Sequence, residues 1–201
     1  MDKLVVLGSG GHATSCVDVI EDSSIFGIAG LVDNKNKNDF MGYPYLGGDE
    51  ILETLRGKFE FAFIAVGQIR SADTRIKLYK KLLSLEFTIP TIFAKDSYVS
   101  KRSNVDIGSI VMHEAIVNAN VKIGRNCILN TRSLIEHDSK IGDFCHISTG
   151  AIVNGNCNIG NESFIGSGSV IKEGVSIGTN CIVGANVFLS SDLSNNTKYI
   201  G

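Results

Sequence analysis

The chain has 201 residues, a length that allows two modest domains with separate cores. Its net charge is −2, and 20% of its residues are charged. This charge balance offers no basic surface to a run of phosphates, so a nucleic-acid partner is disfavoured. No apolar run approaches the ~18 residues that span a bilayer, and no signal-peptide pattern precedes the first strand, so we expect a cytoplasmic protein without membrane insertion.

The first predicted elements are a buried strand, a glycine-rich turn and a helix. Residues 4–7 read Leu-Val-Val-Leu, and residues 8–13 follow directly with the sequence GSGGHA. Apolar residues then recur at helical spacing between positions 16 and 20. The turn fits the G-x-G-x-x-G/A pattern, in which backbone N–H groups at a helix start approach a phosphate. The pattern therefore predicts a phosphate-binding turn.

Two more strands and a second helix complete the N-terminal region. A strand at 27–32 ends before Asp33 and Asn34, where nucleotide-binding folds place an acid for the ribose or base. A strand at 61–66 ends before Gly67, an amphipathic helix follows at 72–85, and a last strand is predicted at 88–93. This is half of a dinucleotide-binding domain, so a single nucleotide fits better than NAD. A dehydrogenase-type or non-catalytic nucleotide-binding protein is the alternative that the same turn would support.

The second half of the chain contains a six-residue repeat. An aliphatic residue stands at every sixth position, namely Val99, Val105, Val111, Val117, Ile123, Leu129, Ile135, Ile141, Ile147, Val153, Ile159, Ile165, Ile171, Ile177, Val183 and Leu189. The residue four positions after each is small, or valine. Three such six-residue sides would close a triangular coil with the aliphatic residue inside and the small residue near a corner. The Ile-Gly pairs at Ile123, Ile141, Ile159 and Ile177 repeat every 18 residues and indicate stacked coils.

The cysteines fit the same repeat. Four of the five occupy the small-residue positions, and the sequence contains no CxxC pair. We interpret them as buried thiol spacers and expect no metal site.

The strongest concentration of ionisable groups in the repeat region lies at residues 130–138, with the sequence NTRSLIEHD. Histidine suits the role of a general base, and a neighbouring carboxylate can raise its pKa and fix its tautomer. We therefore predict catalysis at His137. Either Glu136 or Asp138 could orient the ring, because spacing along a strand does not decide between them.

The linear order of a glycine-rich half-Rossmann domain and hexapeptide coils resembles the hexapeptide-repeat sugar acetyltransferases, closest to bacterial UDP-4-amino-sugar (UDP-N-acetylbacillosamine-type) N-acetyltransferases. The resemblance implies a left-handed parallel β-helix at residues 94–201 after a nucleotide-sugar-binding half-Rossmann βαβαβ domain at 1–93. It also implies a homotrimer that uses acetyl-CoA to acetylate the amino group of a nucleotide-linked 4-amino-sugar in surface glycan biosynthesis. O-acetylation of a sialic-acid-like sugar is the alternative.

The resemblance assigns the site residues by motif. His137 is the general base, Asp138 raises its basicity and Asn130 assists. The nucleotide contacts are Gly10, Gly11, His12, Asp33, Asn34 and Gly67. The acetyl-CoA contacts are His146, Gly166, Ser167, Gly184 and Ala185. Relatives continue into a glycine-proline-containing tail that contacts CoA, whereas residues 195–201 read NNTKYIG without proline.

Overall fold

The computed structural model describes residues 1–35 and 38–201. It forms two compact units, one of residues 1–67 and 73–92 and the other of residues 68–72 and 93–201. The short segment 68–72 leaves the first unit after a strand, packs with the second unit and returns. No helix among the described residues is long and apolar enough to cross a membrane.

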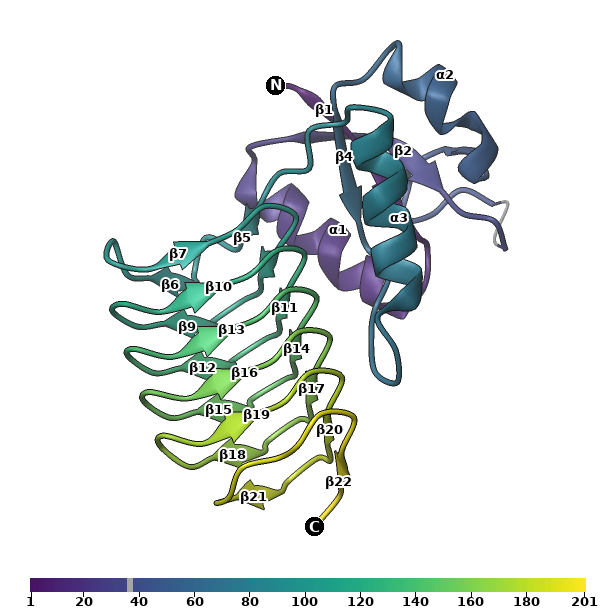
Figure 1. Ribbon diagram of the computed structural model, residues 1–201. Coiled ribbons are helices and arrows are strands. Elements are labelled where there is room, and N and C mark those ends of the chain that lie inside the picture. Colours follow the sequence, from purple (N-terminus) through teal and green to yellow (C-terminus); the bar gives the residue numbers. More distant parts are fainter. Residues whose placement is uncertain (36–37) are drawn as a thin grey trace. The chain divides into compact units, whose positions relative to one another are not determined.

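The first unit is a parallel four-stranded sheet with helices (Figure 1). Its strand order is β3-β2-β1-β4. Its elements are β1 (Lys3–Leu7), α1 (Gly11–Ser23), β2 (Gly27–Val32), β3 (Tyr45–Gly47), the 3-10 turn η1 (Asp49–Ile51), α2 (Leu52–Arg56), β4 (Phe61–Ile64) and α3 (Asp73–Ser84). The central strand β1 is hydrophobic and buried on both faces, as a parallel sheet covered by helices requires.

The sequence-predicted elements of this unit need two corrections. The strand expected at 88–93 does not exist as one element, because Thr88 makes only an isolated bridge to Phe61, whereas Ile92–Phe93 forms a separate strand of the seven-stranded sheet described below. The short edge strand β3 and the helix α2 were not predicted, since neither carries a long periodic apolar pattern. The helix predicted at 72–85 is α3.

The second unit is a parallel β-helix whose two-residue strands stack into three sheets (Figure 1). The seven-stranded sheet contains β5 (Ile92–Phe93), β8 (Ile110–Val111), β11 (Ile128–Leu129), β14 (His146–Ile147), β17 (Phe164–Ile165), β20 (Ile182–Val183) and β22 (Lys198–Tyr199). The six-stranded sheet contains β6 (Tyr98–Val99), β9 (Ile116–Val117), β12 (Leu134–Ile135), β15 (Ile152–Val153), β18 (Val170–Ile171) and β21 (Phe188–Leu189). The five-stranded sheet contains β7 (Asn104–Val105), β10 (Lys122–Ile123), β13 (Lys140–Ile141), β16 (Asn158–Ile159) and β19 (Ser176–Ile177).

The hexapeptide pattern places the core as predicted. From β6 to β21, the second residue of each strand is the aliphatic residue of the repeat, and it points inward because side chains alternate along a strand. Neighbouring strands pair in register at a spacing of 18 residues, for example Ile123 with Ile141. The resulting core includes the aliphatic row and the four buried thiols of Cys127, Cys145, Cys157 and Cys181.

The corners of the coil are sharp turns. The third residue after many strands takes a left-handed conformation, as at Asp138 and Phe144 with φ of 63° and 55°. The glycines of the Ile-Gly pairs do not take this left-handed conformation. They allow one coil to pack closely on the next. A Cβ on Gly142 would lie 2.7 Å from the backbone nitrogen of Asn161 in the next coil. The stacking of coils that the Ile-Gly pairs predicted is therefore confirmed, and these glycines allow neighbouring coils to pack closely.

Candidate functional site

The predicted base, His137, forms a hydrogen-bonded pair with Asp138 at the corner after β12. His137 Nδ1 lies 2.8 Å from Asp138 Oδ2, and Asn120 Nδ2 donates to Asp138 Oδ1 at 2.6 Å. An ionised carboxylate only accepts hydrogen bonds, so Nδ1 carries the proton and Nε2 keeps its lone pair. The hydrogen bonds from Asn120 and His137 lower the pKa of the Asp138 carboxyl. The arrangement leaves Nε2 as the atom that can accept a proton.

The structure decides between the two candidate carboxylates. Glu136 accepts a hydrogen bond from the backbone N–H of His137 at 3.3 Å, whereas Asp138 bonds the ring. Asp138 reaches the ring because its left-handed backbone turns the side chain back along the corner. Asn120, which holds the other carboxylate oxygen, was missed. It stands 18 residues before Asp138, so the coil period could have identified it.

His137 lies on an open surface. Its side chain is 64% exposed, and its ring packs against Gly155 of the next coil, where a Cβ would lie 2.9 Å from the ring carbon Cε1. A shallow pocket is lined here by Glu136, His137, Asn154, Gly155, Asn156, Glu173 and Gly174. Gly155 therefore makes room for the imidazole, another role that the 18-residue period could have identified.

Asn130 lies at a different corner from His137 and contacts His146. Asn130 follows β11 and His137 follows β12, so one side of the triangular coil separates them. Asn130 Nδ2 lies 3.2 Å from His146 Nε2, and Asn130 Oδ1 accepts the backbone N–H of Thr131 at 2.8 Å. Within one chain, Asn130 is thus placed with the predicted acetyl-CoA contacts and not with the predicted base.

The predicted acetyl-CoA contacts gather along one corner of the β-helix. Gly166 and Ser167 follow β17, while Gly184 and Ala185 follow β20 on the next coil. Gly166 also serves packing, because a Cβ there would lie 2.6 Å from the backbone nitrogen of Ala185. Ser148, which sequence reasoning missed, lies on this corner with its Oγ 2.9 Å from Ser167 Oγ.

The predicted nucleotide contacts surround the start of α1 in the first unit. A Cβ on Gly10 or Gly11 would meet nothing within 4 Å, so the backbone at the helix start borders open space. Asp33 Oδ2 accepts hydrogen bonds from both the backbone N–H and the hydroxyl of Ser9, each at 2.9 Å. The carboxylate therefore shapes the glycine-rich turn. Unpaired backbone N–H groups at a helix start favour an anion such as phosphate.

The remaining predicted nucleotide contacts differ in their surroundings. Asn34 exchanges two hydrogen bonds of 2.8 Å with Asp49, one through the backbone N–H of Asp49 and one through its carboxylate. Gly67 faces His12, since a Cβ on Gly67 would lie 3.1 Å from His12 Cβ. His12 Nε2 lies 3.3 Å from Cys16 Sγ, and burial raises the pKa of that thiol to about 12. Gly67 and His12 thus lie side by side, while the Asn34 amide is engaged by Asp49.

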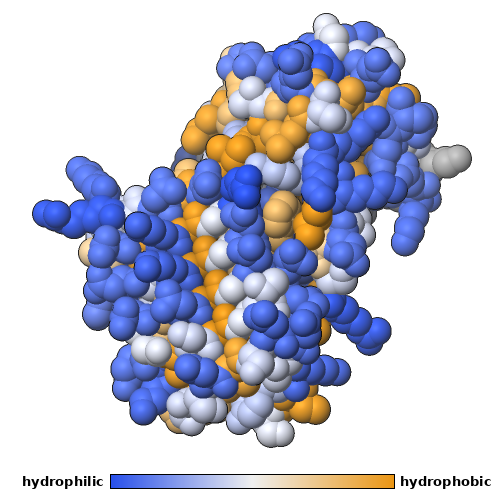
Figure 2. Space-filling view, in the orientation of Figure 1, coloured by the Kyte–Doolittle hydropathy of each residue, from blue (hydrophilic) through white to orange (hydrophobic). Residues whose placement is uncertain are grey.

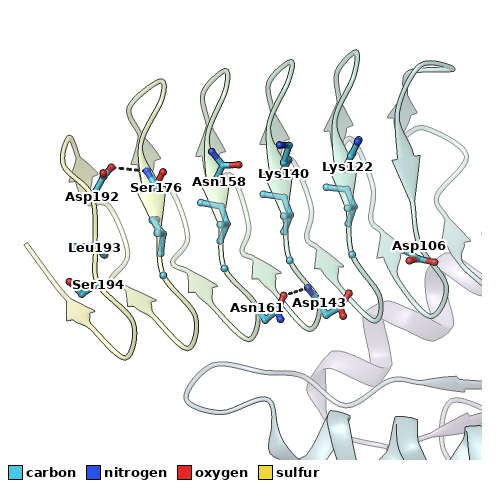
Figure 3. A pocket seen from close by; sticks show the side chains of 18 of the residues that line it. Asp106, Lys122, Lys140, Asp143, Asn158, Asn161, Ser176, Asp192, Leu193 and Ser194 are labelled. Carbon is cyan, nitrogen blue, oxygen red and sulfur yellow. Dashed lines mark hydrogen bonds between the residues drawn. The ribbon is translucent and has the colours of Figure 1, made fainter.

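A separate shallow groove runs along the five-stranded sheet. Its floor is the row of Ile123, Ile141, Ile159 and Ile177 with their following glycines. Figure 2 shows a hydrophobic band along this face, and Figure 3 shows Lys122 and Lys140 in a row on successive strands. No predicted site residue lines the groove.

Comparison with known proteins agrees with this architecture. Residues 3–82 match the family described as PglD N-terminal domain, and residues 156–191 match bacterial transferase hexapeptide (six repeats). PerB of Caulobacter crescentus, solved with CoA and GDP-perosamine, superposes with a TM-score of 0.95 at 29% identity over 100% of this chain and 95% of that chain. The acetyltransferase domain of PglB from Neisseria gonorrhoeae FA1090, solved with acetyl coenzyme A, gives a TM-score of 0.92 at 28% identity over 98% of this chain and 94% of that chain.

A half-Rossmann unit followed by a left-handed parallel β-helix with a histidine and carboxylate pair defines a hexapeptide-repeat acyltransferase. The left hand, which periodicity alone does not give, is that of the matched acetyltransferases. The chain is thus similar to sugar N-acetyltransferases over almost its whole length, in agreement with the resemblance read from its sequence.

Proposed function

We propose that this protein transfers the acetyl group of acetyl-CoA to the amino group of a nucleotide-linked 4-amino-sugar. The observation that carries the proposal is the His137 and Asp138 pair on a β-helix whose relatives were solved with CoA and GDP-perosamine. The open glycine-rich turn supports a nucleotide-linked acceptor, because its helix start suits a phosphate. We further propose that the protein is cytoplasmic and that its product serves surface glycan biosynthesis.

The reaction uses the geometry of His137. The lone pair of its Nε2 takes a proton from the amino group as the nitrogen attacks the thioester carbonyl carbon. The carbonyl π electrons move to oxygen, and a hydrogen-bond donor stabilises that oxyanion. When the tetrahedral adduct collapses, the C–S bond breaks and the CoA sulfur receives the proton from His137. Asp138 stabilises the imidazolium between these steps.

The acetyl-CoA side is assigned to the corner that carries Asn130, Ser167 and Ala185, together with His146 and the glycines Gly166 and Gly184. Small residues expose the main chain there, so the pantetheine arm can pair with backbone groups. Asn130 is assigned to the thioester oxygen, since its carboxamide lies with this group and not with His137. The nucleotide side is assigned to Gly10, Gly11, His12 and Gly67, with Asp33 acting through the turn that it holds.

A homotrimer is part of the proposal. The outward side of the six-stranded sheet is apolar and consists of Tyr98, Ile116, Leu134, Ile152, Val170 and Phe188. Tyr98 and Phe188 are 56% and 62% exposed, and a continuous apolar face of this kind favours burial against another copy. Asn130 and His137 lie at the two edges of this face, so they can meet only when a second chain contributes one of them. Each active site then combines two chains.

Thiol release from acetyl-CoA across UDP-, GDP- and dTDP-linked amino-sugars tests the function. We expect turnover with at least one 4-amino-sugar and none with the matched sugar that carries a hydroxyl at the same carbon. Turnover of the hydroxyl sugar or of a sialic-acid-like acceptor alone would support the O-acetyltransferase alternative. The proposal would be contradicted if no acceptor in the panel raised the rate of thiol release above that of acetyl-CoA hydrolysis.

A further inference from the structure

The segment 68–72 carries a residue that no motif had singled out. Gln68 is 3% exposed and bonds the β-helix through both its side chain and its main chain. Its Nε2 donates to the carbonyl of Phe144 at 2.7 Å and lies 3.5 Å from the carbonyl of Glu162, one coil further on. Two carbonyls on one side of the amide fix its orientation, because only the nitrogen can donate. The side chain therefore anchors this segment to the same corner of two consecutive coils.

The main-chain carbonyl of Gln68 fixes the tautomer of His146. His146 is 6% exposed, and its Nδ1 lies 2.6 Å from that carbonyl oxygen. A carbonyl only accepts, so Nδ1 must carry the proton. The other ring nitrogen, Nε2, faces Asn130 Nδ2, which is the donor end of the amide because Asn130 Oδ1 is used by the N–H of Thr131. His146 is therefore held as the neutral Nδ1–H tautomer, with an edge-to-face contact to Phe164 at 5.2 Å.

We propose that Gln68 is a positioning residue for acetyl transfer, acting through His146 on the carboxamide of Asn130. The chain of contacts runs from the Gln68 carbonyl to His146 Nδ1–H, and from the His146 Nε2 lone pair to one N–H of Asn130. The second N–H of Asn130 is then held in one direction as a donor. The inference rests on the proposed function, in which Asn130 serves the thioester oxygen.

Three variants test the role of Gln68. Gln68→Met keeps the length of the side chain but removes both donor hydrogens. Gln68→Asn keeps the amide on a shorter side chain that no longer reaches both carbonyls. This variant replaces Gln68→Met in the measurements if Gln68→Met fails to fold. Ile69→Ala is the matched control, because Ile69 is in the same segment and its side chain is 64% exposed.

The decisive readout is the protonation pattern of the His146 ring in protein labelled with ¹⁵N-histidine. The chain has only four histidines, and His146→Gln identifies the signal. We expect a protonated Nδ1 and an unprotonated Nε2 in the native protein and in Ile69→Ala. In Gln68→Met, or in Gln68→Asn, we expect the signal to move toward the Nε2–H form. The kcat should fall about 3- to 10-fold, the scale of one lost oriented hydrogen bond.

A double variant tests whether the effect passes through Asn130. Gln68→Met combined with Asn130→Ala should have the kcat of Asn130→Ala alone, because Gln68 and His146 then have no carboxamide to orient. An Nε2–H ring in the native protein, an unchanged tautomer in both Gln68 variants, or additive losses in the double variant would each overturn the proposal. The tautomer is read without substrate, so its outcome is separate from a failure of the proposed acetyl transfer.

Discussion

Replacing His137 by alanine is the most direct test of the mechanism. The variant removes the Nε2 lone pair, so we expect kcat to fall by about 10²–10⁴, the contribution of a positioned general base. This corresponds to about 3–5 kcal/mol of transition-state stabilisation. The side chain is 64% exposed, so its loss should change the free energy of unfolding by no more than about 0.5 kcal/mol. The two ligand affinities should stay close to native, since the loss appears only in the transition state.

The assay is thiol release at saturating acetyl-CoA and amino-sugar nucleotide, with the melting temperature measured on the same samples. His113→Ala is a matched control. His113 Nδ1 lies 2.9 Å from Asp96 Oδ1, so this variant also breaks a histidine and carboxylate pair, but at another corner of the coil. It should retain its kcat within about twofold, as expected of a surface pair.

Asp138→Ala should lower kcat less than His137→Ala does. The double variant should be hardly slower than His137→Ala alone, because the carboxylate acts only by orienting and stabilising the ring. Near-native kcat in His137→Ala at neutral pH would refute the assignment of the base. Additive losses in the double variant would show that Asp138 acts independently of the ring.

The remaining predictions concern the substrates, the assembly, the packing and the carboxylate. Asp33→Ala should raise the KM of the nucleotide sugar with little change in that of acetyl-CoA, because the carboxylate holds the glycine-rich turn through Ser9. Steady-state kinetics with each substrate varied would show this, and equal effects on the two KM values would count against it. Ile152→Glu puts a charge on the apolar face of the six-stranded sheet, so this variant should be a monomer by light scattering and should lack activity. If the native protein were a fully active monomer of 21.6 kDa, an active site shared between two chains would be excluded. Gly166→Ala should lower the melting temperature by about 3–10 °C, since its Cβ would press on the next coil, while Gly11→Ala, which meets open space, should leave it unchanged. Asn120→Ala removes the first cause of the lowered pKa of Asp138, so that pKa should rise toward its ordinary value in a ¹³C carboxyl titration, and an unchanged value would show that His137 alone sets it.

The sequence by itself determined the coil and its core. A six-residue period needs no long-range information, because each strand ends in one inward aliphatic residue and each coil repeats the previous one. This is why Ile123 and Ile141 pair in register and why the cysteines at the small positions are buried, as predicted. The glycine-rich turn and the start of α1 could also be predicted from local sequence, since a strand, a turn and a helix follow one another directly along the chain.

Only the tertiary structure decided which side chains meet. The choice of Asp138 over Glu136 depends on the left-handed backbone of one residue. The separation of Asn130 from His137 follows from the triangular section of the coil, which places residues seven positions apart at different corners. The contact between Gln68 and His146 joins positions 78 residues apart, and no local pattern marks it. Periodicity fixes which way a side chain points, whereas these contacts depend on which coil, corner or segment lies opposite, and that is set only when the whole chain has folded.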